Sequence, residues 1–333
     1  MNLVLSNGVS LAFVLFASFL WNTWVISLKY LDRDYPLDAF VLDIYIFSCL
    51  LMWGTGFVLE GPRLTAQVVQ AWQKEPHLVL LILALGVLLS GGVRLSLGII
   101  SSVGLMLTVA IRASIVILVG TVVSMLAGGL PAGASPGLIL TAAGLLVLAV
   151  IAGVLASQER DRNGAQLAVQ LDRVDRGVVG QALASALLVV GYAYGLSVGV
   201  RSTSHPEGLS AVAYMVLLST GSLLGALAWG GGRLSRRQQW GAWRRAPARY
   251  HWLAAVCAAA HFGGNLLHAL GVPALSTAIA WPLGTGGNLW TYLWGLAFGE
   301  FRGAPHKAWL LLGLTVTLFA GGGMLLALGQ YGG

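Results

Sequence analysis

The chain has few charged residues and almost no cysteine. Asp, Glu, Lys and Arg make up only 9% of its 333 residues, whereas 57% are hydrophobic. This composition excludes a water-soluble domain and predicts a chain whose main solvent is lipid. The two cysteines, Cys49 and Cys257, lie inside apolar runs. Neither a disulfide nor a metal site is expected there, so both are interpreted as buried thiols.

The motifs of several functional classes are also missing. There is no Lys/Arg-rich start with a small-residue cleavage site, so no removable signal peptide is expected. Titratable groups inside the apolar runs are too sparse for a catalytic set, and these runs contain no HExxH motif, no DxxD-type acidic pair and no paired cysteines. We therefore predict no enzyme activity, no catalytic residues, no metal and no cofactor.

What the sequence does contain is a series of apolar runs long enough to cross a bilayer as helices. We predict an all-α integral membrane protein of about ten transmembrane helices, without a separate soluble domain. The expected spans are residues 8–28, 37–59, 77–99, 103–128, 135–156, 178–200, 209–229, 251–271, 274–299 and 308–330.

The basic residues between these runs predict the orientation. Most of them follow odd-numbered spans, in the stretches 158–176 and 233–249 above all, whereas Arg63, Lys74 and Arg201 lie on the other side. The positive-inside rule then places both termini outside the cell and the two basic stretches in the cytoplasm. The net charge of +7 is therefore a topology signal. Anionic lipid at the cytoplasmic face of the inner (plasma) membrane explains the basic stretch 233–249 better than nucleic acid does.

The first basic stretch divides the chain into two five-span halves, residues 1–157 and 178–333, joined by a cytoplasmic loop over residues 158–177. An odd number of spans in each half makes the halves insert in opposite directions, as in inverted-repeat transporters. A short echo supports a repeat, because residues 117–121 (ILVGT) resemble residues 281–285 (WPLGT).

Several short pieces are spread along the whole chain: residues 19–24 (FLWNTW), 42–43 (LD), 86–92 (GVLLSGG), 103–105 (VGL), 119–121 (VGT), 264–265 (GN) and 294–302 (WGLAFGEFR). In their order and spacing these pieces resemble the ureide permease group. That group is similar to the bacterial glucose/ribose and rhamnose permeases of the drug/metabolite transporter superfamily. The resemblance implies a ten-helix 5+5 inverted repeat and, in uptake members, proton-coupled import of neutral solutes.

The chain departs from this family at positions that bear on the substrate. Val93 and Arg94 stand where the family has an asparagine in span three, and Val109 stands where it has a glutamate in span four. The family's substrates are therefore not carried over.

Charged residues inside the spans are the first candidates for a binding site, because a charge in the membrane costs at least about 2.5 to 3.5 kcal/mol. Arg94 and Arg112 lie at similar depth on neighbouring spans, and Asp43 lies at a compatible depth in span two. One hypothesis is that Asp43 pairs with an arginine when the site is empty, and that its protonation couples transport. The alternatives are a static Arg-Asp-Arg clamp that fixes helix packing, or arginine side chains that snorkel toward the cytosolic membrane interface.

Neutral polar side chains form further candidate surfaces. His261, Asn265 and His268 lie on one stripe of span eight and are expected to line a cavity, unless they only bond neighbouring helices. Pro282 and the run GTGGN predict an interrupted span nine, with Thr285 and Asn288 beside freed backbone carbonyls. The remaining substrate-binding candidates are Asn22, Trp24, Tyr192 and Tyr214.

These features favour a secondary active transporter of a small polar metabolite: a ureide, nucleobase, sugar or small carboxylate. Proton-coupled uptake through a central site between the halves is the leading hypothesis. The expected partners are this solute, a proton as coupling ion and membrane lipids; homodimerisation is left open. The alternative is an exporter of the same superfamily, because the sequence does not indicate a direction, and a membrane-embedded enzyme is a remote third reading.

Overall fold

The computed structural model describes residues 5–32, 34–103, 105–130, 133–161, 176–202, 204–287 and 289–331. Regular structure in these ranges is helical, apart from one isolated bridge between Val200 and Leu209. The long helices are α1 (Asn7–Thr23), α2 (Leu37–Glu60), α4 (Pro76–Val103), α5 (Leu105–Gly128), α6 (Pro136–Asp161), α8 (Arg176–Gly199), α9 (Ala211–Ala226), α12 (Ala248–Leu275) and α15 (His306–Tyr331). The shorter elements are the 3₁₀ helix η1 (Trp24–Tyr30), α3 (Pro62–Lys74), the π-helical turn η2 (Leu227–Gly231), α10 (Gly232–Arg236), α11 (Trp240–Arg244), α13 (Thr277–Thr285) and α14 (Leu289–Ala297).

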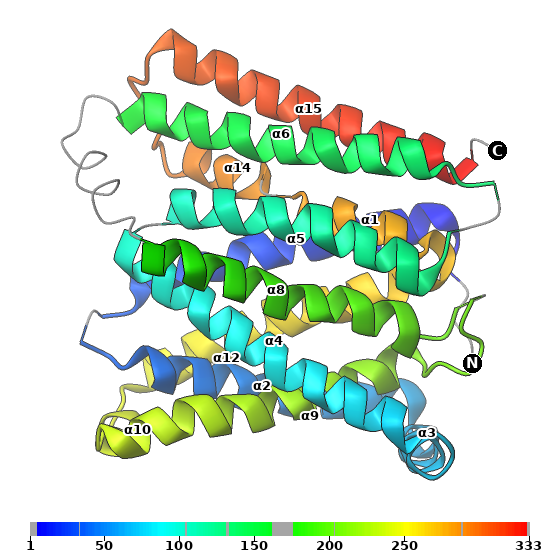
Figure 1. Ribbon diagram of the computed structural model, residues 1–333. Helices are drawn as coiled ribbons and strands as arrows, with labels where there is room; N and C mark the ends of the chain where they lie inside the picture. The colour runs from blue at the N-terminus through cyan, green and yellow to red at the C-terminus, as the bar shows by residue number, and fades with distance from the viewer. Residues whose placement is uncertain are drawn as a thin grey trace.

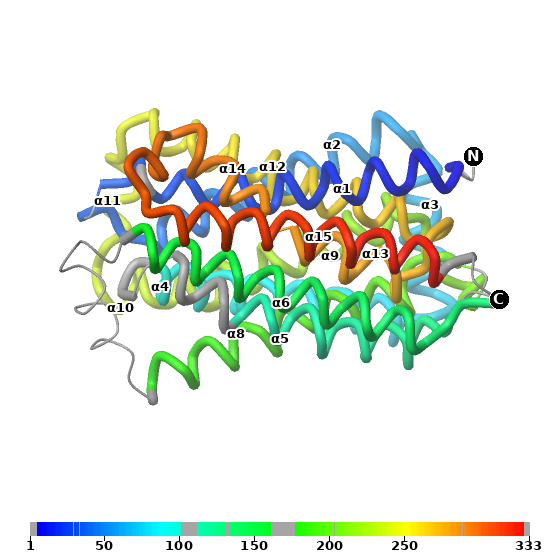
Figure 2. Tube along the Cα trace, turned by 90° about the horizontal axis from the view of Figure 1, so that it is seen from above, coloured from blue at the N-terminus to red at the C-terminus, as the bar shows by residue number. Residues whose placement is uncertain are grey.

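The long helices run side by side along a common direction and form one bundle (Figure 1). The start of α1 and the end of α15 lie at the same end of this bundle, and α10 and α11 lie at the other end (Figure 2). In the described part of the chain, eight segments are long and apolar enough to cross a membrane. The protein is therefore an all-α, multi-pass membrane protein.

Two expected spans are not among these eight segments. Residues 103–128 correspond to α5, whose apolar part at Arg112–Gly128 falls below the length of a full span in the described residues. Residues 274–299 are divided between α13 and α14, each nine residues long. The count of ten spans stays a prediction.

The interruption expected in span nine is present. α12 ends at Leu275, and Ser276 takes a positive φ of 64° that turns the chain into α13. Pro282 lies inside α13, which ends at Thr285, and α14 begins at Leu289. Asn288, one of the candidate ligands, lies outside the described residues. The break places two helix ends within the bundle, where backbone groups become free for other partners.

The short helix α3 is an element that the apolar runs did not predict. Figure 1 views α3 nearly along its axis while the long helices run across the picture, so α3 lies crosswise to the bundle. Its apolar side chains include Trp72, which is 51% exposed, and Val69. A helix with one apolar face that lies crosswise at the end of the spans is typical of the membrane interface.

Glycines set the distance between α4 and α9. A Cβ atom on Gly86 would lie 2.4 Å from the carbonyl oxygen of Leu218, and one on Gly221 would lie 2.2 Å from that of Leu83. No side chain fits at either position, so the two backbones are in direct contact. Close approach through small residues is the usual packing mode of helices in lipid.

The expectation that both cysteines are buried is wrong for one of them. Cys257 is 1% exposed, but Cys49 is partly exposed on α2. An apolar run predicts contact with lipid or with protein equally well, and the side of α2 that carries Cys49 is only partly covered by α9, where Thr220 lies 3.9 Å from the sulfur.

Candidate functional site

A cavity of about 140 Å³ lies inside the bundle, between helices from both halves of the chain. We call it the central cavity. It is large enough for several waters or one small solute. Its lining residues are Trp21, Asn22, Trp24, Val25, Leu89, Val93, Ser96, Leu97, Ile100, Arg112, Ala113, Val116, Val189, Tyr192, His261, Asn265, Trp281, Gly284, Thr285 and Thr291.

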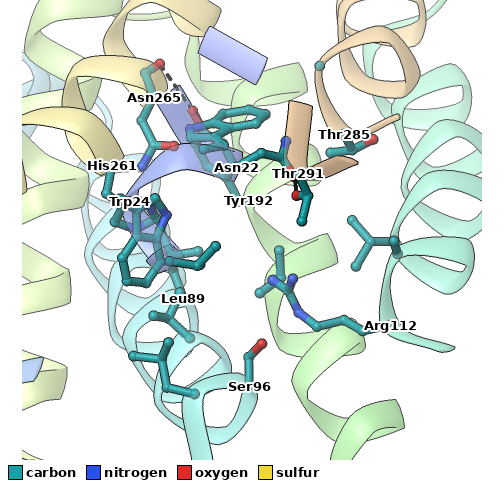
Figure 3. Close-up of a pocket in the computed structure, with 18 of the residues that line it drawn as sticks. Asn22, Trp24, Leu89, Ser96, Arg112, Tyr192, His261, Asn265, Thr285 and Thr291 are labelled. Atoms are coloured by element: carbon teal, nitrogen blue, oxygen red, sulfur yellow. Dashed lines mark hydrogen bonds between the residues drawn. The ribbon is translucent and has the colours of Figure 1, made fainter. Parts of the chain in front are cut away.

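Arg112 is the charged residue of the central cavity. Its side chain extends from α5 into the cavity, toward the wall formed by α12 (Figure 3). The Nε atom is buried without a hydrogen-bond partner, and Arg112 forms no ion pair with another described residue. An arginine remains protonated in proteins. The cavity therefore carries a positive charge that the described part of the protein does not neutralise.

His261 and Asn265 face Arg112 from α12 (Figure 3). Asn265 is 2% exposed and His261 is 7% exposed. The amide Nδ2 of Asn265 and both ring nitrogens of His261 lack a hydrogen-bond partner within the described protein. Buried polar groups are nearly always hydrogen-bonded, so these groups are suited to a polar molecule in the cavity.

Aromatic rings form the remaining walls. The ring of Trp24 lies 5.0 Å from that of His261, and the ring of Tyr192 lies 5.8 Å from that of Trp281. Trp281 is held in place because its Nε1 donates a hydrogen bond to the carbonyl of Val116 at 2.9 Å. Such walls suit the face of a planar or apolar group.

Two hydroxyl groups and an amide complete the polar lining. Asn22 Nδ2 donates to the Ser18 carbonyl at 2.8 Å, and its Oδ1 accepts from Thr291 Oγ1 at 3.3 Å. Thr285 Oγ1 donates to the carbonyl of Trp281 in the preceding turn at 2.7 Å. The contact between Asn22 and Thr291 joins α1 to α14 at the edge of the cavity.

A second cavity of about 650 Å³ adjoins the first. We call it the vestibule. The two cavities share Val25, Ile100 and Thr291, and the vestibule extends toward Arg237 and Gln239, at the end of the bundle that carries α10 and α11. The central cavity and the vestibule thus lie on either side of a shared wall, and the vestibule reaches one end of the protein.

Arg94 lines the vestibule and not the central cavity. Its Nε donates to Asp38, in the first turn of α2, and Arg233 lies 3.6 Å from the same carboxylate. The hypothesis that an arginine pairs with Asp43 is therefore wrong in this structure. Asp38 lies at the start of the span, is only 5% exposed, and is the carboxylate that pairs with Arg94.

Asp43 pairs with residues from the second half of the chain. Its Oδ1 accepts a hydrogen bond from Trp243 Nε1 at 2.7 Å, and its Oδ2 lies 2.8 Å from His251 Nδ1. Asp43 lines neither of these two cavities. His251, which the sequence analysis did not single out, is thus one of its two partners.

Two other candidates lie away from the central cavity. His268 is fully buried behind Trp21, with ring centroids 4.9 Å apart, and its Nε2 lies 3.0 Å from the carbonyl of Ala280. Tyr214 is fully buried at Gly195, where an added Cβ atom would lie 2.6 Å from its hydroxyl. Both side chains fill space between helices.

Glu300 and Tyr35 also line the vestibule, and their surroundings determine their charges. Glu300 accepts a hydrogen bond from Arg160 at 2.8 Å. Burial raises the pKa of the Tyr35 phenol, so this hydroxyl stays uncharged at neutral pH. In the described part of the chain, no group of three His, Cys, Asp or Glu side chains is placed to hold a metal ion.

The structure therefore brings Asn22, Trp24, Arg112, Tyr192, His261, Asn265 and Thr285 together around one cavity and leaves Arg94, Asp43, Tyr214 and His268 outside it. It adds Trp21, Ser96, Trp281 and Thr291 to the polar and aromatic lining. Ser96 and Thr291 had no sequence signal, because single hydroxyl residues are common in membrane helices. No protein-family model matches the chain, and no curated protein matches it in sequence.

Proposed function

We propose that the protein is a secondary transporter that carries a small polar solute through the central cavity. The observation that supports this best is the set of buried polar groups without described protein partners around Arg112, Asn265 and His261, in a cavity that adjoins the vestibule inside a membrane bundle. Polar groups are expensive inside a membrane and are usually found where a solute passes.

We also propose that the fold is an inverted repeat of two five-span halves, with α13 and α14 together as the ninth of ten spans. The main contacts between helices have counterparts when α1, α2, α4, α5 and α6 are exchanged with α8, α9, α12, α13–α14 and α15. Thus α4 contacts α9 as α12 contacts α2, α1 contacts α12 as α8 contacts α4, and α5 contacts α8 as α13 contacts α1. Such symmetry supports alternating access about a site between the halves.

The local echo in the sequence agrees with this symmetry. Thr121 Oγ1 donates to the Ile117 carbonyl at 2.6 Å, just as Thr285 Oγ1 donates to the Trp281 carbonyl. The two segments belong to α5 and α13, which contact each other. The resemblance of short sequence pieces to the drug/metabolite transporter superfamily points in the same direction.

Proton-coupled uptake is part of the proposal. Asp43 on α2 and His251 on α12 form a protonatable pair that joins the two halves. Adding or removing a proton there changes the strength of a contact between the halves. With the basic stretches in the cytoplasm of a bacterial-type inner membrane, both termini face outside and the vestibule opens inward, as expected for the state that releases solute after uptake.

Accessibility of the central cavity from both sides of the membrane tests this function without knowledge of the substrate. Thr285→Cys in a background with Cys49→Ala and Cys257→Ala would be labelled with a membrane-impermeant thiol reagent in right-side-out and inside-out vesicles. A transporter exposes Thr285→Cys to both sides in turn, faster from the side of α10 and α11. Ser204→Cys, at the exposed opposite end, serves as the one-sided control. Labelling of Thr285→Cys from one side only, or from neither, refutes the transporter.

Proton coupling has a separate measurement. A pH gradient across the vesicles is expected to change the ratio of the two labelling rates, and Asp43→Asn is expected to abolish that change. If the pH gradient leaves the ratio of labelling rates unchanged in the parent protein, the proposal of transport stands but the proposal of proton coupling is refuted.

A further inference from the structure

The charges around the central cavity define what kind of solute it accepts. Among the described lining residues, Arg112 alone has a formal charge, and the rest are apolar, aromatic or neutral polar groups. A cation in such buried surroundings favours a negative partner, because charges are screened less inside the protein than in bulk water.

The vestibule wall carries four carboxylates. Asp38 is paired with Arg94 and Arg233, Glu300 with Arg160 and Asp32 with Arg249, and Asp34 lies in the same wall. None of the four lines the central cavity, and Asp43, which is bonded to His251 and Trp243, lines neither cavity. Within the described lining of the central cavity, Arg112 therefore has no carboxylate beside it.

The wall opposite Arg112 has a complementary chemistry. The Nδ2 of Asn265 is a donor without an acceptor, and His261 offers one donor and one acceptor. The rings of Trp21, Trp24, Tyr192 and Trp281 present apolar faces between these polar groups. A molecule that satisfies all of them has an anionic head at Arg112 and a compact, planar or apolar body that carries few polar atoms.

From this arrangement we propose that the solute is a small monoanion, with one carboxylate-like group bound by Arg112 and a planar or apolar body held between the aromatic walls. One negative charge balances the one cation of the cavity. A neutral solute leaves Arg112 unpaired, and a dianion brings a second charge for which the described lining has no counterpart. The inference rests on the proposed function only in taking this ligand as the transported solute.

Matched pairs of anions and amides test the proposal on the purified full-length protein. Equilibrium dialysis with radiolabelled benzoate and benzamide compares two planar molecules of the same shape that differ in charge. At pH 7 benzoate is expected to bind at least about tenfold more tightly, as charge-assisted hydrogen bonds predict. Competition by isobutyrate and isobutyramide repeats the comparison with an aliphatic body, and phthalate, a dianion, is expected to compete less well than benzoate.

Variants assign the preference to one residue. Arg112→Gln is expected to reduce benzoate binding to the level of benzamide while benzamide binding changes less than twofold. Arg112→Lys, which keeps the charge but not the forked donors, retains a weakened preference for benzoate. The control is the double variant Asp38→Asn/Arg94→Gln, which removes the neighbouring membrane arginine together with its partner and is expected to keep the preference. Size-exclusion profiles establish that each variant is folded.

The proposal is overturned if benzamide binds as tightly as benzoate, if Arg112→Gln keeps the preference, if the control variant loses it, or if neither anion binds. The proposed function does not fall with it, because the two-sided labelling of Thr285→Cys needs no ligand. Loss of that labelling with an intact preference for benzoate would leave an anion-binding membrane protein that does not transport.

Discussion

Replacing Arg112 with methionine should stabilise the protein, whereas replacing Arg94 with methionine should destabilise it. Arg112 has no described counter-charge, whereas Arg94 neutralises Asp38, a carboxylate that is 5% exposed. Arg112→Met therefore removes an unfavourable charge from the membrane. Arg94→Met removes half of a buried ion pair and leaves the other half.

The two magnitudes follow from the surroundings of each residue. An arginine at the centre of a membrane helix costs about 2.5 to 3.5 kcal/mol, and access to the cavity offsets part of this, so Arg112→Met is expected to stabilise by about 1 to 2 kcal/mol. Breaking a buried pair costs about 3 to 5 kcal/mol. For Arg94→Met we expect a loss of stability of about 3 kcal/mol, the low end of this range, because Arg233 remains 3.6 Å from Asp38.

Thermal unfolding of the purified variants in one detergent, without added carboxylates, measures this difference. The melting temperature should rise for Arg112→Met and fall for Arg94→Met, and benzoate should raise that of the parent protein but not of Arg112→Met. Arg63→Met, at the start of α3, is the control and should leave the melting temperature unchanged. Equal destabilisation by both membrane substitutions would refute the reasoning, because it would show that Arg112 has an internal partner.

Three further predictions concern packing and the halves of the bundle. Gly120→Ala places a Cβ atom 2.0 Å from Trp281 Nε1, so it should destabilise the protein by about 1 to 3 kcal/mol and weaken benzoate binding. Gly263→Ala, whose Cβ atom meets nothing within 4 Å, is the control and should do neither; thermal unfolding and equilibrium dialysis measure the two effects. Asp43→Asn keeps an acceptor for Trp243 but loses the charge beside His251, and should lower unfolding stability by about 1.5 to 3 kcal/mol in the same melting assay, with no effect if the pair is not formed. N-ethylmaleimide should modify Cys49 in the folded protein and Cys257 only after unfolding, as mass spectrometry of the peptides would show; equal modification contradicts the burial of Cys257.

The positions of the helices follow from long apolar runs, and eight of the expected spans correspond to segments able to cross a membrane. Pro282 and the glycines after it also predicted the break between α13 and α14. The helix α3 was not predicted because its 13 residues mix polar and apolar side chains, so that on a hydropathy scale the segment resembles a loop. A helix in the interface does not need a continuous apolar run.

Partners of charged residues were harder to predict than their depth. Arg94 and Asp43 were placed at compatible depths, but pairing also depends on which side of each helix faces the other. Asp38 lies five residues before Asp43 and so points to a different side of α2, toward Arg94, while Asp43 points toward Trp243 and His251. The direction of a side chain around its helix is set by the packing of the whole bundle, which spacing along one helix does not determine.

The contact between Gly86 and Gly221 has a consequence for motion in the membrane. Side chains can slide and change rotamer as helices shift, but two backbones in contact have nothing between them that can yield. We therefore expect the contact between α4 and α9 to act as a hinge axis, about which the rest of each half rotates while the two helices keep their spacing. An added methyl group at Gly86 or Gly221 is expected to restrict this rotation before it unfolds the chain.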